Sequence, residues 1–260
     1  MSSNIYTPHL ARIKSVKDEA EGIKSFKLEF EDGELRDSFD YRPGQFIELT
    51  VFGVGEAPFS IASSPINKGY LEISVAGVGE VTSALNLKKA GGLVGVRGPY
   101  GNGFPFDEVR GRDILIIGGG IGFAPLRSLI NQMFAHRDSF GKITILHGAE
   151  TLQRLCFRDE LKNWSQKKDC EVLIGVRKSL PKVSVDGGRT AAFVSGPPIM
   201  VQFAIQGLLE KGVKEDNIII CMERRMECGL GKCGHCNIGR AYVWLLYTSD
   251  AADELDGVWL

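Results

Sequence analysis

The sequence predicts an antiparallel β barrel, then a doubly wound parallel-sheet α/β domain, then a short cysteine-rich segment. Three observations support this order. Short runs such as SFKLEF, FIELTV and YLEISV alternate apolar and polar residues and are separated by glycine and proline, which is typical of antiparallel barrels or sandwiches. After Gly111, apolar runs alternate with helical stretches, which indicates parallel strands with crossovers. Three of the six cysteines then fall between Cys228 and Cys236.

Length and composition are those of an ordinary globular protein. The 260 residues are enough for about two domains, with 43% hydrophobic and 24% charged residues. We expect the barrel at residues 8–110, the nucleotide-binding domain at 111–222 and the cysteine segment at 223–240. The net charge of -1 gives no reason to expect a nucleic-acid or membrane partner. With neither a signal peptide nor a long apolar span in view, we expect a cytoplasmic location.

The parallel sheet is predicted from five buried runs. They read DILIIGGG, KITILHGAE, CEVLIGV, AAFVSGP and NIIICME. Helical stretches separate most of them, reading APLRSLINQMFAHR, CFRDELKNWSQKK and PIMVQFAIQGLLEKG. Near-continuous apolar strands of this kind are buried on both faces, so we expect helices on both sides of the sheet.

A glycine-rich turn follows the first of these strands, in LIIGGGIGFAPLRSLI. Glycines let the backbone approach a ligand, and the free N–H groups at a helix start attract a pyrophosphate. Pro125 suits the first helical turn. Phe123 stands where the dinucleotide fingerprint has its last glycine, so a tight turn without a ligand is the alternative. The candidate nucleotide-binding residues here are Gly118, Gly119, Gly120, Ile121, Gly122 and Pro125.

A second small-residue turn, SGPPIM, lies at the end of a later strand, where open α/β sheets bind ligands. It adds Ser195, Gly196, Pro197 and Pro198 as candidates. Glu150 ends the second strand, where an acid accepts from a ribose hydroxyl and favours NADH. Arg154 lies nearby and would favour NADPH by pairing with a 2′-phosphate. Each of the two is alternatively a solvated surface charge.

Two barrel segments carry a resemblance, APFSIASSP and GEVTSAL. Alone they read as a strand end and a helix start capped by Thr82 or Ser83. Together with VRGPYGNGF and the glycine turn, their order resembles the ferredoxin–NADP reductase superfamily over nearly all of residues 8–240. In that superfamily a flavin-binding barrel precedes a pyridine-nucleotide domain. The resemblance implies FAD contacts from Pro58, Phe59, Ser60, Ile61, Gly79, Val81, Thr82 and Ser83.

The resemblance also implies roles for the catalytic candidates. Phe59 would pack on the flavin ring, and Ser60 would lie near the reactive N5 atom. The superfamily places an arginine where this chain has Ala57, so a pyrophosphate contact is missing. Phosphate binding would then depend on the helix start that follows Gly79.

The cysteine segment has the spacing C-x4-C-x2-C, formed by Cys228, Cys233 and Cys236. This is the plant-type [2Fe–2S] spacing, which normally has a fourth cysteine further on. One alternative is a structural zinc site in which His235 joins the three thiolates. Another is three thiols without a metal.

The longer stretch CMERRMECGLGKCGHCNIG narrows the resemblance to the gamma subunits of cytoplasmic sulfhydrogenases. The dihydroorotate dehydrogenase electron-transfer subunit and the anaerobic sulfite reductase B subunit are similar. The resemblance implies electron transfer between NAD(P)H, FAD and a [2Fe–2S] cluster, with a hydrogenase, sulfur or sulfite reductase, or dihydroorotate dehydrogenase type of partner subunit. The alternatives are the reductase component of an oxygenase and a non-catalytic nucleotide-binding regulatory subunit with structural zinc.

The segment after the third cysteine departs from that family. Trp244 occupies the place of the expected fourth cysteine, and LLYTSDAADE resembles a translated sequencing adapter. We therefore interpret residues 241–260 as a non-native tail, the alternative being a divergent natural one. Either way, we expect the chain as written to hold a cluster poorly.

Overall fold

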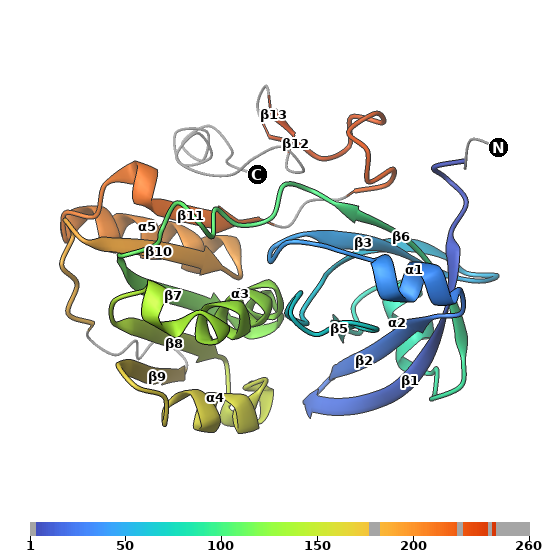
Figure 1. Cartoon of the computed structure of the whole chain (residues 1–260), viewed down its shortest axis with the longest axis horizontal. Helices are drawn as coiled ribbons and strands as arrows, with labels where there is room; N and C mark the ends of the chain where they lie inside the picture. The colour runs from blue at the N-terminus through green and yellow to red at the C-terminus, as the bar shows by residue number, and fades with distance from the viewer. Residues whose placement is uncertain (1–3, 177–182, 223–225, 239–240, 243–260) are drawn as a thin grey trace.

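The computed structural model describes residues 4–176, 183–222, 226–238 and 241–242. Trp244 and the rest of the adapter-like stretch lie outside the described residues. A barrel and an α/β part lie side by side, and the cysteine segment runs along one edge of the pair (Figure 1). Within these ranges, no helix combines the length and the apolar character that a bilayer crossing requires.

The barrel is one antiparallel sheet with the strand order β4-β3-β6-β1-β2-β5. Its strands are β1 (His9–Ala20), β2 (Ile23–Phe30), β3 (Phe46–Val51), β4 (Gly55–Ser60), β5 (Leu71–Ala76) and β6 (Leu93–Tyr100). An antiparallel bridge between Ile61 and Ile73 joins the two edges. The predicted barrel is confirmed.

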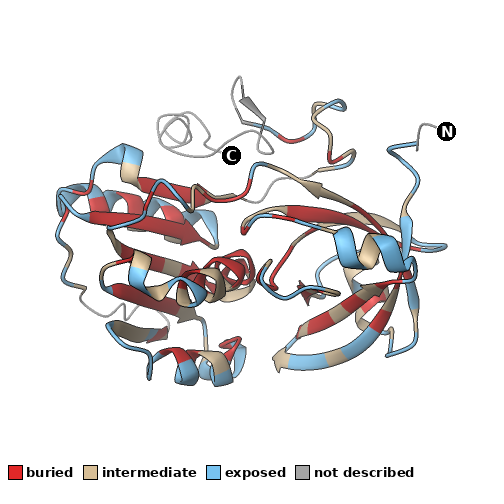
Figure 2. Cartoon of the chain, viewed as in Figure 1, coloured by how far each residue is buried: buried red, intermediate tan, exposed pale blue. Residues whose placement is uncertain are grey.

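The alternating runs place every second side chain inside the barrel. In β2, Phe26, Leu28 and Phe30 are 0%, 1% and 4% exposed, and the residues between them are half-buried. Figure 2 shows buried residues in the other barrel strands as well, almost without interruption in β3. Two short helices, α1 (Gly33–Ser38) and α2 (Glu80–Asn86), complete this part.

The α/β part has a five-stranded parallel sheet with the order β11-β10-β7-β8-β9. Its strands are β7 (Asp113–Gly119), β8 (Ile143–Ala149), β9 (Cys170–Val176), β10 (Thr190–Ser195) and β11 (Ile218–Cys221). The helices are α3 (Phe123–Ala135), α4 (Arg158–Trp164) and α5 (Pro198–Glu210), with 3-10 turns η1 (Gly120–Gly122), η2 (Arg137–Ser139), η3 (Leu152–Arg154) and η4 (Glu215–Asn217). A short hairpin, β12 (Asn237–Ile238) and β13 (Ala241–Tyr242), follows the cysteines.

Helices cover both faces of this sheet, as the apolar runs predicted. Ile114 and Ile116 pack with α3 and α4 in one core cluster. Leu115, between them, packs with α5 in another. The α4 helix is shorter than its predicted stretch at both ends, because it begins after Phe157, which has a φ of 58°, and ends at Trp164.

The sheet reverses its order between β7 and β10, which are direct neighbours. Reversal points of this kind form crevices at the carboxyl ends of the strands. Both small-residue turns of the sequence follow these two strands. Chain topology therefore brings the two predicted nucleotide-binding turns together.

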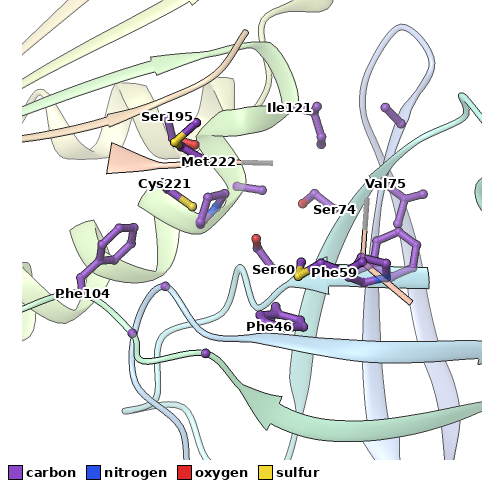
Figure 3. A pocket seen from close by; sticks show the side chains of 18 of the residues that line it. Phe46, Phe59, Ser60, Ser74, Val75, Phe104, Ile121, Ser195, Cys221 and Met222 are labelled. Atoms are coloured by element: carbon purple, nitrogen blue, oxygen red, sulfur yellow. The ribbon is translucent and has the colours of Figure 1, made fainter. Parts of the chain in front are cut away.

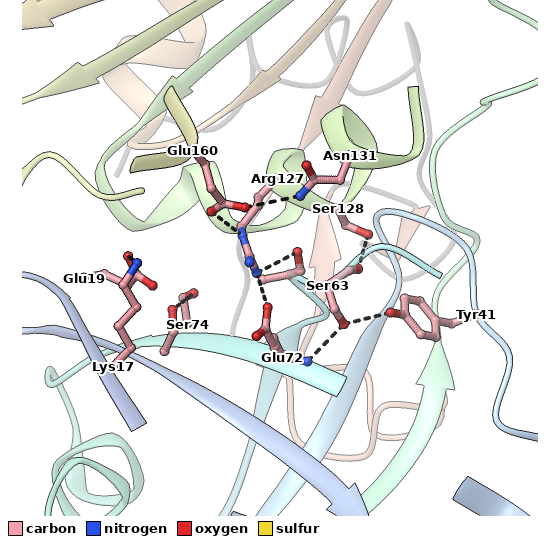
Figure 4. A network of polar contacts seen from close by, with 12 residues as sticks. Lys17, Glu19, Tyr41, Ser63, Glu72, Ser74, Arg127, Ser128, Asn131 and Glu160 are labelled. Atoms are coloured by element: carbon pink, nitrogen blue, oxygen red, sulfur yellow. Dashed lines mark hydrogen bonds and ion pairs between the residues drawn. The ribbon is translucent and has the colours of Figure 1, made fainter. Parts of the chain in front are cut away.

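A buried polar network joins the barrel to the α/β part (Figure 4). Arg127 of α3 donates from Nη1 to Glu72 Oε2 at 2.7 Å and from Nε to Glu160 Oε2 at 2.7 Å. Beside it, the hydroxyl of Ser128 donates to the carbonyl of Ser63 at 2.6 Å. Because these groups are largely buried, the contacts fix how the sheet sits against the barrel.

Candidate functional site

A cavity of about 300 Å³ lies where the barrel faces the carboxyl edge of the parallel sheet. Figure 3 shows Phe59, Ser60 and Ser74 on the barrel side and Ile121, Ser195 and other sheet-edge residues opposite. The volume is at the small end of the range of ligand pockets. The lining residues come from both parts of the chain, so the cavity exists only because the two pack together.

The APFS strand supplies part of the cavity wall. Pro58, Phe59 and Ser60 line it. They end β4, whose pairing with β3 places Phe59 opposite Ile47 and Ser60 opposite Phe46. Ile61 is fully buried, packs in the barrel core and donates its N–H to the carbonyl of Gln45. The structure thus places the first three of these candidates at the cavity and Ile61 behind them.

The helix start predicted from GEVTS is formed at α2. Thr82 Oγ1 accepts from the N–H of Gly79 at 2.8 Å and from that of Val78 at 3.0 Å. Thr82 and Val78 line the cavity. Val81 packs against the barrel core, and Ser83 is exposed. Of the four candidates, Thr82 is the one brought to the cavity.

The glycines of the two turns serve mainly to let the turns touch. A Cβ on Gly122 would lie 2.6 Å from Gly196 Cα, and one on Gly119 would lie 3.0 Å from Pro197 Cδ. Gly120 differs, because it has a φ of +54° and open space where a Cβ would be. The predicted approach of backbone to ligand therefore applies best at Gly120.

The neighbours of the glycine turns complete the sheet side of the cavity. Ile121, Pro125 and Ser195 line it. Pro125 lies in the first turn of α3, as predicted, and Pro198 is the first residue of α5. The two turns thus place the starts of α3 and α5 beside each other.

Phe123, in place of the last fingerprint glycine, is buried under the turn. Its ring stacks on His147 with the centroids 4.0 Å apart, and a Cβ on Gly118 would lie 2.2 Å from it. Burial lowers the pKa of His147 to about 4. The neutral ring lies with Nδ1 3.2 Å from the carbonyl of Gly118, so Nδ1 carries the proton and donates. The stacked rings of Phe123 and His147 thus pack against the glycine turn at Gly118 and hold its backbone in place.

Glu150 and Arg154 pair with each other. Arg154 Nη1 lies 2.8 Å from Glu150 Oε2, and both side chains are mostly exposed. They follow β8 at the carboxyl edge of the sheet. The structure therefore places Glu150, which would favour NADH, next to Arg154, which would favour NADPH. Their pairing leaves the preference between the two coenzymes open.

The three clustered cysteines differ in exposure. Cys236 is buried, Cys228 is half-buried and Cys233 is exposed. Cys228 Sγ accepts from the N–H groups of Leu230 and Lys232, each at 3.3 Å. The N–H of His235 lowers the pKa of the Cys233 thiol. None of the six cysteines, all of which are in the described ranges, forms a disulfide.

His235 lies near Cys233 and also near Glu227, a carboxylate that the sequence analysis did not consider as a metal ligand. Ligand atoms of Glu227, Cys233 and His235 all lie within 4.8 Å of one another, and these three residues are exposed. His235 Nδ1 is 3.3 Å from Glu227 Oε2. In the described part of the chain, Cys228 and Cys236 are not members of this group. The arrangement therefore differs from the Cys3His set considered from the sequence.

Several cavity residues were not foreseen. Phe46, Ser74 and Phe104 come from strands and loops far apart in the sequence, and Met222 and Met226 follow β11. The segment VRGPYGNGF contributes to the resemblance, and its loop, through Asn102, also lines the cavity. Gly101 and Gly103 both have a φ of 77°. Glycine adopts this backbone conformation readily, so these two glycines were the sequence signal of a tight loop at this place.

The residues of the cavity and of the cysteine segment fit the two groups that the sequence resemblance implies, FAD and a [2Fe–2S] cluster. The cavity offers an aromatic wall at Phe59 and hydroxyls at Ser60 and Thr82, which suits a flat ring with polar edges. At the cysteines, two backbone N–H groups already point at one sulfur. Such donors stabilise thiolates and cluster sulfurs.

Comparison with known proteins agrees with this geometry. Residues 116–206 match the family model described as the oxidoreductase NAD-binding domain. The sulfhydrogenase 1 gamma subunit of Pyrococcus furiosus is 37% identical over 265 residues, which cover 96% of this chain and 91% of that protein. A probable dihydroorotate dehydrogenase B electron-transfer subunit of Methanocaldococcus jannaschii is 32% identical over 88% of this chain and 83% of that protein.

The chain belongs to this family of sulfhydrogenase gamma and dihydroorotate dehydrogenase electron-transfer subunits. The resemblance predicted from the sequence is therefore confirmed. Among solved structures, the NADH-dependent reduced ferredoxin–NADP oxidoreductase that performs flavin-based electron bifurcation superimposes with a TM-score of 0.70. It is 25% identical, and the match covers 91% of this chain and 83% of that one. The superposition thus covers both the barrel and the nucleotide sheet of this chain.

Proposed function

We propose that this chain is the electron-transfer subunit of an oxidoreductase complex, passing electrons between NAD(P)H, FAD and a [2Fe–2S] cluster. A partner catalytic or electron-carrier subunit of the hydrogenase, sulfur or sulfite reductase, or dihydroorotate dehydrogenase type would take or supply them. The observation that carries the proposal is the cavity shared by Phe59 and Ser60 of the barrel and Ile121 and Ser195 of the sheet. Residues 8–110 would bind FAD, 111–222 NAD(P)H and 223–240 the cluster, in the cytoplasm.

The residues of the cavity have distinct tasks in this proposal. Bound FAD would take a hydride from NAD(P)H and release single electrons to the cluster. Phe59 forms an apolar wall for a flat ring, and Ser60 offers a hydroxyl to its polar edge. Thr82 holds the start of α2 in place for a phosphate, and Gly120 leaves its backbone open to a second one.

The cysteine segment would hold the cluster with Cys228, Cys233 and Cys236. Glycines with positive φ at 229, 231 and 234, between 68° and 82°, bend the loop, and the N–H groups of Leu230 and Lys232 point at Cys228 Sγ. Three thiolates alone would hold a cluster weakly, because plant-type [2Fe–2S] sites use four ligands. We therefore keep the interpretation of residues 241–260 as a non-native tail; recovering this same tail by independent amplification of the source locus would disprove it.

Two other functions remain as alternatives. The reductase component of an oxygenase uses the same two modules. The group of Glu227, Cys233 and His235 favours instead a nucleotide-binding regulatory subunit that carries zinc. Metal analysis separates them, because iron with acid-labile sulfide supports electron transfer and zinc supports the regulatory subunit.

The first test is a visible absorption spectrum after anaerobic reconstitution with iron, sulfide and FAD, repeated after NADH is added. We expect flavin bands that bleach with NADH, together with bleaching of the sulfur-to-iron charge-transfer absorption. Flavin bleaching alone would support the reductase modules and point to the altered tail as the reason for the missing cluster. A protein that retains no flavin would contradict the proposed function.

A further inference from the structure

The cysteine loop lies directly on the outer face of the barrel, over β3 and β6. Gly229, next to Cys228, is buried and has a φ of +68°. A Cβ there would lie 3.0 Å from Glu48 Cγ and 3.0 Å from Tyr100 Cδ2. The loop backbone therefore packs against these two side chains with no room for a larger residue.

Arg97 of β6 reaches from the barrel to the same loop. Its side chain is 5% exposed, and Nη1 donates to the carbonyl of Cys228 at 3.4 Å and to Tyr100 Oη at 3.1 Å. On its other side, Nε donates to Glu56 Oε2 at 3.1 Å, and Thr50 Oγ1 donates to the same oxygen at 2.7 Å. The barrel thus holds the guanidinium in one orientation, with a donor aimed at the loop.

Tyr100 connects the loop to the wall of the cavity. It pairs in register with Phe46 across β3 and β6, and their ring centroids are 5.8 Å apart. Phe46 lines the cavity. This aromatic pair therefore lies between the cavity and the backbone at Gly229.

Glu48 forms the floor under the loop. Its side chain is 1% exposed, and Oε1 has no hydrogen-bond partner among the described residues. A buried polar atom of this kind is costly, and it lies where Gly229 of the loop meets the barrel. The loop is therefore seated on a polar patch built from Glu48, Glu56, Arg97 and Tyr100.

We propose that Arg97 and Tyr100 are positioning residues that seat the cysteine loop on the barrel behind Phe46, and thereby fix where the cluster lies relative to the flavin cavity. The inference rests on the proposed function, because only the proposed function assigns a [2Fe–2S] cluster to this loop. Neither residue would bind the cluster directly. Arg97 acts through its hydrogen bond to the Cys228 carbonyl, and Tyr100 acts through its contact with Gly229.

Hydrogen exchange of residues 226–238 in the metal-free chain tests the seating itself. We expect this segment to exchange about tenfold faster or more in Arg97→Met, which loses the hydrogen bond to the Cys228 carbonyl, and in Tyr100→Leu, which loses the ring that packs against Gly229. Arg97→Lys and Tyr100→Phe should restore most of the protection. Arg137→Met is the matched control, since Arg137 in η2 also donates to backbone carbonyls, those of Lys168 and Phe140 in the α/β part.

Exchange equal to wild type in both Arg97→Met and Tyr100→Leu would overturn the seating. If Arg97→Met does not fold, Tyr100→Leu compared with Tyr100→Phe decides the question by the same readout. In reconstituted protein, we further expect the Arg97 and Tyr100 variants to shift the midpoint potential and the electron paramagnetic resonance spectrum of the dithionite-reduced cluster while FAD content stays the same. An unchanged potential and spectrum would contradict the positioning role. A wild-type chain that binds no iron would point to the altered tail as the reason for the missing cluster, whereas the exchange comparison in the metal-free chain would still decide the seating.

Discussion

Arg127 of α3 binds Glu72 of the barrel across the interface, with Nη1 and Oε2 2.7 Å apart. The same guanidinium binds Glu160 of α4, so one side chain joins three elements. Its side chain is 15% exposed, and those of the two acids are 24% exposed. The two carboxylates, through contact and hydrogen bonding, raise the pKa of Arg127 against the effect of its burial.

Replacing Arg127 with Met should destabilise the protein strongly. Removing one partner of a buried ion pair leaves the other charge buried, which costs about 3–5 kcal/mol. Urea denaturation of the full chain measures the loss. Arg12→Met is the control, because the Arg12–Glu31 pair is 40% exposed on each side and solvent screening leaves such a pair little effect on stability. Equal losses in the two variants would contradict the structural role of Arg127.

Ser60→Ala should slow the reduction of bound flavin by NADH about tenfold, because a hydrogen bond worth about 1.4 kcal/mol corresponds to that factor in rate. Stopped-flow absorbance after FAD reconstitution measures the rate. Flavin content should not change, since Phe59 and the rest of the wall are intact. Ser38→Ala on α1, away from the cavity, serves as the control. A rate unchanged by Ser60→Ala would remove Ser60 from the catalytic candidates.

A methyl group on Gly122 should disrupt the contact between the two turns. The Cβ would lie 2.6 Å from Gly196 Cα, so we expect a loss of about 1–3 kcal/mol of stability and weaker NADH binding. Gly207→Ala on α5 is the matched control. Its Cβ meets nothing within 4 Å, so alanine should stabilise the helix by about 0.5–1 kcal/mol. Thermal unfolding and NADH titration of both variants check the pair.

Glu150→Gln should shift the coenzyme preference toward NADPH. Arg154 is released from its 2.8 Å pair with Glu150 and becomes available to a 2′-phosphate. An exposed pair of this kind is worth up to about 1 kcal/mol, which limits the shift to about fivefold. The ratio of kcat/KM for the two coenzymes measures it. A ratio that does not move would place both residues outside the nucleotide site.

Acid should weaken the α/β part through His147. Burial lowers the pKa of His147 from 6.5 to about 4, so the unfolded chain takes up this proton first. The stabilisation is fully present above pH 6.5 and is lost as the pH falls through 6.5 toward 4, by up to about 3 kcal/mol. His147→Gln should flatten the pH dependence of the unfolding free energy in that window. A pH dependence in that window that His147→Gln leaves unchanged would refute the assignment.

The local pattern of apolar residues and glycines was sufficient to predict the fold and part of the candidate site. The alternation of Phe26 and Leu28 in the barrel, and the strand-turn-helix at Gly120, follow from the chain's own periodicity and were predicted. Arg127 was not foreseen, because on a helix it looks like any surface charge until Glu72 is brought to it by the tertiary fold. Phe46 was missed for the same reason, since its place in the cavity depends on strands far apart in the sequence.

The cysteine segment adds a further link between the two parts of the chain. The chain crosses from barrel to sheet through residues 101–112, and Arg127 of α3 binds Glu72 of the barrel. Beyond β11, Arg97 of the barrel donates to the carbonyl of Cys228. The two walls of the cavity are therefore held at one spacing before a ligand enters, so that ligand binding needs little reordering of the two parts.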